Sequence, residues 1–261
     1  SPLLTPTQHQ QYQQLIGMLN WLVQLGRFDI AFATSSMSRF TAAPREQHLT
    51  RVLKIWGYLK KTQTLRTHIL SSPLHFENFS HKHIDNDVVK QMRQEYPDAT
   101  EELDNRAPKQ IYPEIPMTAF VDADHAHDLV TRRSITGLII FLGKTQICFT
   151  PKRQTSISTS TYGAEFNALR TATEEIIALR YALRSMGVQV HSPTITFGDN
   201  RGVILNTTIP DSLLKKKHVA ISYHRVREAV AAGIVWTVHI KSEHNFADLL
   251  TKALRRPQFK G

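Results

Sequence analysis

The sequence predicts an α/β protein in which a mixed five-stranded sheet with flanking helices follows a small helical bundle. Through residues 1–61, apolar residues recur at helical spacing. From residue 117 onward, strand-like and helix-like runs follow one another in the order β-β-β-α-β-α-α-β-α. This order predicts three meandering antiparallel strands, with later strands reached through helical crossovers.

The N-terminal bundle is predicted from three apolar stripes over residues 1–70. The face of the first helix consists of Tyr12, Ile16, Leu19 and Val23. Gly26 provides a stop after this helix, and a second helix is expected over residues 29–40. A third helix begins after Pro44, and its expected stripe is Leu49, Val52, Leu53, Trp56 and Leu59.

Residues 71–114 differ in composition from both flanking parts. They hold nine acidic residues against five basic ones, whereas residues 1–70 hold eight basic against two acidic. Four prolines and an acidic run interrupt any period, so an acidic linker or a surface insertion is expected. One short helix is predicted near residues 88–95.

The C-terminal part, residues 115–261, carries the predicted sheet. Its expected strands cover residues 117–122, 137–142, 146–149, 194–197 and 234–240. Its expected helices cover residues 163–186, a short stretch from Asn200, and residues 219–232 and 246–254.

Composition limits the class of protein. No apolar run approaches the roughly 20 residues that a membrane-spanning helix needs, so no membrane partner is expected. The single cysteine, Cys148, excludes an intramolecular disulfide and cysteine-based zinc sites, and it favours a reducing, intracellular setting. The net charge of +10 is typical of proteins that bind nucleic acid.

Four acidic residues stand where this topology can gather them. Asp122 and Asp199 each end a predicted strand on the same side as apolar neighbours, which is costly for an isolated carboxylate. Glu165 is the first member of an apolar stripe with alternating spacings of four and three residues. Asp248 lies toward the rim of the last helix, where the helix dipole accounts for it almost as well as catalysis does.

Crowded carboxylates repel one another, and hard divalent cations with oxygen ligands relieve that repulsion. Two Mg²⁺ ions, or Mn²⁺ as a substitute, would activate water and stabilise a leaving oxygen in phosphodiester hydrolysis. The residue pattern therefore predicts a metal-dependent phosphodiesterase.

Several dispersed motifs resemble the ribonuclease H domain of copia-type retrotransposon polyproteins. They are, in order, residues 120–126 (FVDADHA), 133–137 (RSITG), 152–156 (KRQTS), 164–169 (AEFNAL), 198–200 (GDN), 217–224 (KHVAISYH) and 247–252 (ADLLTK). Residues 12–21, 28–33, 51–54 and 58–60 resemble the segment that follows the reverse transcriptase palm in the same polyproteins. The resemblance implies a ribonuclease H-like sheet behind a thumb-like helical region.

By resemblance, Asp122, Glu165, Asp199 and Asp248 are the metal-binding catalytic acids, with Asp124 as a competitor of Asp122. His218 and His244 are weaker candidates for site residues. The resemblance implies hydrolysis of the RNA strand of RNA–DNA hybrids. The residues expected to contact nucleic acid are Lys152, Arg153, Gln154, Ser158, Asn200 and Lys217.

The resemblance also implies two partners, an RNA–DNA hybrid and the polymerase domain of the same polyprotein. It implies a cytoplasmic location in a virus-like particle, with the nucleus as a further site. The alternative is a hybrid-binding clamp without catalysis. A polymerase is disfavoured because no Tyr-x-Asp-Asp motif occurs, and an integrase because the acids follow the order Asp-Glu-Asp-Asp.

Overall fold

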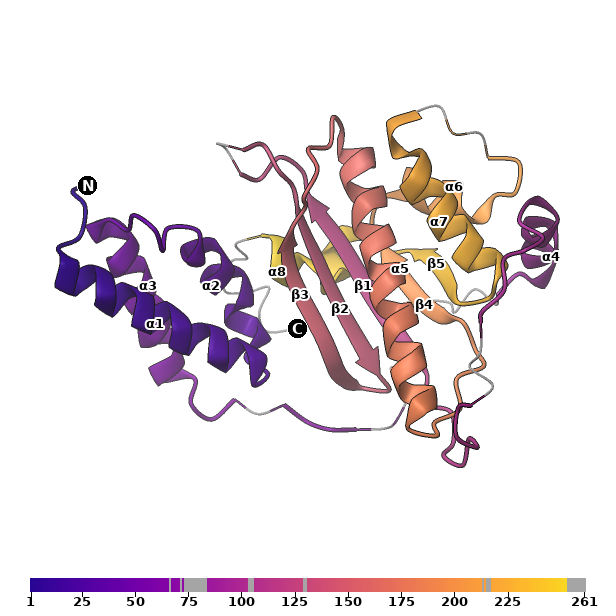
Figure 1. Ribbon diagram of the computed structural model, residues 1–261, viewed down its shortest axis with the longest axis horizontal. Coiled ribbons are helices and arrows are strands. Elements are labelled where there is room, and N and C mark those ends of the chain that lie inside the picture. The colour runs from indigo at the N-terminus through magenta and orange to yellow at the C-terminus, as the bar shows by residue number, and fades with distance from the viewer. Residues whose placement is uncertain are drawn as a thin grey trace. The chain divides into compact units, whose positions relative to one another are not determined.

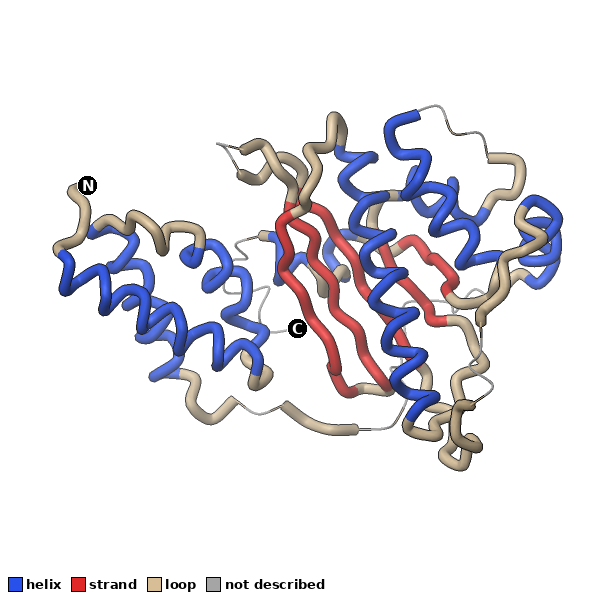
Figure 2. Tube along the Cα trace, in the orientation of Figure 1, coloured by secondary structure: helices blue, strands red, loops and turns tan. Residues whose placement is uncertain are grey.

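The computed structural model describes residues 1–65, 67–70, 72, 84–102, 106–128, 131–212, 214 and 217–252. The chain forms two compact units, one containing Ser1–His68 and the other Ile69–Thr251. The first unit is helical, and the second combines helices with a sheet (Figures 1 and 2). Both parts agree with the predicted fold class.

The first unit consists of helices joined by short connections. Their bounds are α1 Pro6–Gln24, the 3-10 turn η1 Phe28–Ile30, α2 Ala31–Ser38 and α3 Glu46–Lys61. A capping box between Thr5 and Gln8 starts α1 and satisfies backbone donors of its first turn. The single helix predicted over residues 29–40 is instead a 3-10 turn followed by α2.

The predicted apolar face of α1 is confirmed, since Tyr12, Ile16, Leu19 and Val23 are all buried. The stripe expected on α3 is partly wrong. Val52 and Leu59 are buried together with Ile55, whereas Leu53 is half exposed. One residue further along an α-helix lies about 100° around its axis, so the face of Val52 and Ile55 excludes Leu53.

The second unit contains the predicted five-stranded mixed sheet. Its strands are β1 Met117–Asp124, β2 Ile135–Leu142, β3 Thr145–Arg153, β4 Thr194–Gly198 and β5 Val235–His239. Their order is β3-β2-β1-β4-β5. The β1–β2 and β2–β3 pairs are antiparallel, and the β1–β4 and β4–β5 pairs are parallel.

Helices cover both faces of this sheet. Their bounds are α5 Thr161–Ser185, α6 Arg201–Thr208, the 3-10 turn η2 Lys217–Val219, α7 Ala220–Ala231, the 3-10 turn η3 Ser242–His244 and α8 Asp248–Thr251. One face packs on α5 and α7 through a large apolar core, with α8 on the opposite face (Figure 1). The opposite face has a smaller core of Phe120, Phe197, Ile240 and Ala247.

Residues 84–102 pack into the second unit. The predicted short helix is confirmed as α4 Asn86–Glu95, and α4 packs on α7. The guanidinium group of Arg227, which is fully buried, pairs with Glu95. Arg93 Nε donates to the backbone oxygen of Ala231 at 2.9 Å. These contacts favour an insertion over a linker for this stretch.

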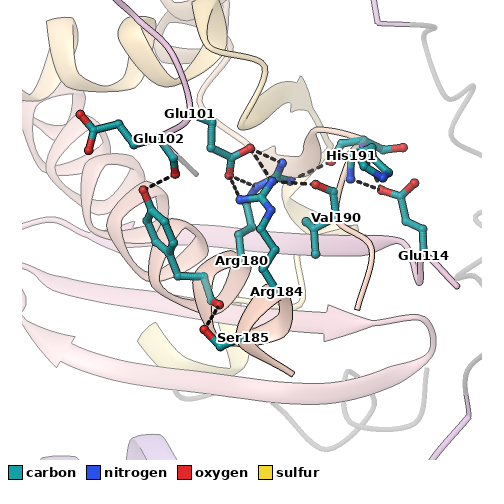
Figure 3. A network of polar contacts seen from close by, with 10 residues as sticks. Glu101, Glu102, Glu114, Arg180, Arg184, Ser185, Val190 and His191 are labelled. Atoms are coloured by element: carbon teal, nitrogen blue, oxygen red, sulfur yellow. Dashed lines mark hydrogen bonds and ion pairs between the residues drawn. The ribbon is translucent and has the colours of Figure 1, made fainter. Parts of the chain in front are cut away.

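A second anchor lies just beyond α4. The carboxylate of Glu101 accepts hydrogen bonds from Arg180 and Arg184 of α5, at 2.6–2.8 Å (Figure 3). Burial alone would raise the pKa of the Glu101 carboxyl, but the two guanidinium groups outweigh burial and lower this pKa to about 2. The segment after α4 is therefore held by charge-assisted hydrogen bonds.

The last helix is predicted over residues 246–254, and α8 covers Asp248–Thr251. The residues after Lys252 lie outside the described part. The histidines at positions 75, 81 and 83, whose clustering in the sequence suggests a weak metal-binding candidate, also lie outside it. Among the described helices, none combines the length and the apolar character needed to cross a membrane.

Candidate metal centre

Three acidic side chains converge at one edge of the sheet. Asp122, Glu165 and Asp199 each offer a carboxylate oxygen, and these oxygens lie within 4.8 Å of one another. Asp122 and Glu165 are buried, and Asp199 is partly exposed. Like charges at this distance in a poorly hydrated place repel one another strongly.

The parallel pairing of β1 with β4 brings the two aspartates together. Val121 is opposite Gly198 in this register, so the residues that follow them, Asp122 and Asp199, reach the same edge. Carboxyl ends of parallel strands are where side chains from separate strands meet. The register of the two strands therefore places both acids together, although β1 continues beyond the predicted strand end at Asp122 to Asp124.

Glu165 comes from the first turns of α5. Ser160 caps this helix by accepting a hydrogen bond from the backbone nitrogen of Gly163 at 3.2 Å. Glu165 shares a buried stripe with Leu169, Ala172 and Ile176. The inward position predicted from helical spacing is thus observed, although Met186, at the far end of the predicted stripe, is exposed.

Two hydroxyl groups donate to the aspartates. Thr251 Oγ1, from α8, donates to Asp122 Oδ2. Ser242 Oγ, from η3, donates to Asp199 Oδ2 at 2.6 Å. Hydrogen bonds of this kind restrict the orientation of a carboxylate.

Asp248 is at the start of α8 and is partly exposed. Among the described residues, the group of converging metal-ligand atoms contains Asp122, Glu165 and Asp199 but not Asp248. The structure thus brings together three of the four predicted acids. Since α8 packs on β1 and β2, Asp248 belongs to an element that also covers this edge of the sheet.

Asp124 was the competitor of Asp122 for the site. It ends β1, and its carboxylate lies 2.5 Å from Nδ1 of His127. The converging group contains Asp122 rather than Asp124. Asp124 therefore has a partner of its own in the loop that follows the strand.

The residues expected to contact nucleic acid fall into two groups. Lys152 and Arg153 are exposed on β3, and Lys217 is exposed at the start of η2. Arg153 also pairs with Asp128 at 3.3 Å. Exposure leaves these cations accessible to phosphate groups, and their contact with nucleic acid stays a prediction.

Gln154 and Ser158, in contrast, are buried. Gln154 Nε2 donates to Thr136 Oγ1 at 3.0 Å and to the backbone oxygen of Ala164 at 2.8 Å. Ser158 Oγ donates to Gln154 Oε1 at 3.3 Å. These hydrogen bonds link the end of β3 to α5, and contact of Gln154 or Ser158 with RNA stays a prediction.

Asn200 has a local role as well. Its Oδ1 accepts a hydrogen bond from the backbone nitrogen of Val203 at 3.2 Å and so caps α6. His244 is partly exposed, and its Nε2 lies 3.5 Å from Oε1 of Glu243. Lys215, Lys216 and the side chain of His218 lie outside the described residues.

The sequence did not single out Thr251, Ser242, Asn245 or Gly137 as site residues. Gly137 in β2 lies opposite Asp122, and a Cβ there would come within 2.7 Å of Ala247 O and Thr251 Cγ2. A glycine inside a strand is a known signal of such a close approach. The hydroxyl donors carry no comparable signal.

Comparison with known proteins connects this chain with transposon polyproteins. No protein-family model matches it. It is 25% identical to the retrovirus-related Pol polyprotein from transposon RE1 of Arabidopsis thaliana, over 97% of this chain. It is 25% identical to that of transposon RE2 over 96% of the chain, and 24% identical to that of transposon TNT 1-94 of Nicotiana tabacum over 95%.

These homologues are much longer polyproteins, and the chain spans 14% of the length of the RE1 and RE2 polyproteins. The predicted resemblance to retrotransposon polyproteins is confirmed.

The structural neighbours are ribonuclease H domains. The N-terminal RNase H domain of a Mycobacterium tuberculosis protein is 12% identical, with 52% of this chain and 91% of that chain covered at a TM-score of 0.40. RNase H1 from Halobacterium salinarum is 16% identical, with 50% and 89% covered at a TM-score of 0.37.

Proposed function

We propose that the unit Ile69–Thr251 is a metal-dependent ribonuclease H that hydrolyses the RNA strand of RNA–DNA hybrids within a retrotransposon reverse transcriptase. The observation that carries the proposal is the convergence of Asp122, Glu165 and Asp199 within 4.8 Å. The homology of the chain to Pol polyproteins supports the same conclusion.

The donor set fits a hard divalent cation. All three groups are carboxylates, and oxygen ligands suit Mg²⁺ and Mn²⁺ better than softer metals. We infer that Asp122, Glu165 and Asp199 hold the metal and that Asp248, by its place in the family motif, completes the set. Two bound ions would supply an activated water and stabilisation of the leaving oxygen.

The side chains of the unit then have separate tasks. The three carboxylates concentrate negative charge at the edge of the sheet, so they favour cations over the bare phosphate backbone. Lys152 and Arg153, exposed on β3, and Lys217 offer positive charge to the substrate strands. Selection of RNA over DNA requires contact with 2′-hydroxyl groups, and Asn200, beside Asp199, is the nearest predicted donor in sequence.

The proposal includes the setting of the reaction. The partners are an RNA–DNA hybrid and the polymerase domain of the same polyprotein, with the helical unit as a thumb-like region. The location is intracellular, in a cytoplasmic virus-like particle and in the nucleus. The proposed ribonuclease H activity would therefore serve the copying of the element's own RNA.

The test is incubation of the purified chain with an RNA–DNA hybrid labelled on each strand, with and without Mg²⁺. Cleavage of the RNA strand alone, dependent on metal and lost in Asp122→Asn, is the expected result. Glu165→Gln should also abolish cleavage, while Glu174→Gln, on the exposed side of the same helix, should cut normally. Cleavage that survives Asp122→Asn would overturn the site.

The second candidate is a hybrid-binding clamp without catalysis. The observation that favours it is the position of Asp248 outside the converging group. Tight, salt-sensitive binding of the hybrid, without cleavage at any Mg²⁺ or Mn²⁺ concentration, would support the clamp and contradict the nuclease.

A further inference from the structure

The segment from Ser242 to Thr251 contacts two of the three converging carboxylates from one side. Thr251 Oγ1 donates to Asp122 Oδ2, and Ser242 Oγ donates to Asp199 Oδ2 at 2.6 Å. Thr251 is fully buried, whereas Ser242 is exposed. One stretch of chain therefore provides a hydroxyl donor to each of the two aspartates.

Two further contacts keep this segment in place. Asn245 is buried, and its Nδ2 donates to the backbone oxygen of Val121 at 2.9 Å, immediately before Asp122. Asn245 Oδ1 accepts from the backbone nitrogen of Ala247 at 3.1 Å. Gly137 lets α8 approach β2 closely, since a Cβ there would meet Ala247 O and Thr251 Cγ2 at 2.7 Å.

The chemistry of the donors matters. A lysine or arginine beside these acids would neutralise them and compete with a cation, but a hydroxyl has no charge. It restricts rotation of the carboxylate while the negative charge remains available to a cation. Partners of this kind orient metal ligands in known metal sites.

We propose that Thr251 and Ser242 are positioning residues that hold Asp122 and Asp199 in the orientation that binds a divalent cation, before any substrate is present. This inference rests on the proposed metal site. We name the segment Ser242–Thr251 the hydroxyl clasp. Thr251 has the larger effect, because its hydrogen bond is buried.

The test measures binding of Mn²⁺ or Mg²⁺ alone to the full chain by isothermal titration calorimetry, without nucleic acid. Thr251→Val keeps the side-chain shape and removes the hydroxyl, and should weaken cation binding by about tenfold or more. Thr251→Ser restores a hydroxyl and should bind nearly as the unaltered chain does. Ser242→Ala should weaken binding less than Thr251→Val.

A matched control is Thr194→Val in β4. Thr194 is as buried as Thr251, and its hydroxyl has no hydrogen-bond partner among the described residues. This variant should bind cations normally. Thermal unfolding in EDTA monitors the fold of every variant, and Ser242→Ala, altered at an exposed position, keeps the test decisive if Thr251→Val fails to fold.

Failure of the clasp is distinguishable from failure of the metal site. If the unaltered chain binds Mn²⁺ and Asp199→Asn does not, while folded Thr251→Val and Ser242→Ala both bind as the unaltered chain does, the clasp is wrong and the site stands. If Asp199→Asn binds the cation as well as the unaltered chain does, or if the unaltered chain binds none, the metal site itself is wrong and the clasp falls with it.

Discussion

At one edge of the sheet Asp122, Glu165 and Asp199 bring three carboxylates together, whereas farther along α5 the guanidinium groups of Arg180 and Arg184 close on the single carboxylate of Glu101. Both clusters are largely shielded from water. The second contains its own counter-charges, so removing one partner would leave a buried charge uncompensated. The first gathers like charges, which opposes folding and creates affinity for a cation. The two clusters thus differ in the charges that surround each carboxylate more than in their burial.

The largest expected effect separates activity from stability at the carboxylate cluster. Asp199→Asn should reduce RNA cleavage by at least about a thousandfold, because it removes one of the proposed metal ligands. Hybrid binding should survive, and the melting temperature in EDTA should not fall, because repulsion between the acids is relieved. Cleavage assays and thermal melts compare it with Asp211→Asn, at an exposed position. Undiminished cutting would remove Asp199 from the site.

The arginine-bound cluster should respond in the opposite way. Glu101→Gln should lower the free energy of unfolding by about 3 kcal/mol, because two buried guanidinium groups lose their counter-charge. Glu102→Gln, at an exposed position, should change it by less than about 0.5 kcal/mol. Urea titration measures both variants. Equal midpoints would show that the Glu101 cluster does not hold the segment.

Acid should remove the stabilisation that Glu101 provides. Its pKa is lowered in the folded chain from 4.5 to about 2, so the folded state favours the ionised form. The stabilisation is therefore complete above pH 4.5 and is lost as the pH falls toward 2. The difference in unfolding free energy between the unaltered chain and Glu101→Gln should shrink across this window. A constant difference would contradict the ion-pair explanation.

A smaller effect is expected where α8 approaches the sheet. Gly137→Ala places a Cβ about 2.7 Å from Ala247 O and Thr251 Cγ2, so α8 must shift. The expected cost is about 1–3 kcal/mol of unfolding free energy, together with weaker cation binding. Gly17→Ala, where a Cβ meets nothing within 4 Å, should be neutral or slightly stabilising. Unchanged stability and cation binding in Gly137→Ala would mean that the close approach is unimportant.

The smallest effect concerns the exposed cations. Arg153→Gln should weaken binding of any hybrid sequence by a few-fold and reduce the salt dependence of binding by about one charge. Fluorescence anisotropy at several salt concentrations measures this slope, with Arg225→Gln, on α7, as the comparison. A slope equal to that of the unaltered chain would exclude Arg153 from the contact surface.

The sequence predicts the fold and three converging acids because these depend on local periodicity. Glu165 belongs to a stripe of helical spacing, Asp122 lies near the carboxyl end of β1, and Asp199 directly follows β4. Periodicity identifies which side of an element is buried, and strand direction then brings the two aspartates to one edge.

Local periodicity does not identify the hydroxyl donors. Thr251 meets Asp122 across 129 positions of sequence, and Glu101 meets Arg180 across 79. Such contacts depend on where a helix settles on the sheet, which single-residue patterns do not encode. The choice of Ile55 over Leu53 on α3 has the same origin, since both residues are apolar and only packing separates them.

The late position of the hydroxyl clasp in the chain has a consequence for synthesis. All five strands and all three converging acids precede Ser242, so a growing polypeptide can complete its sheet on the ribosome while Asp122 and Asp199 still lack their hydroxyl partners. Competence to bind metal would then be the last property the unit acquires.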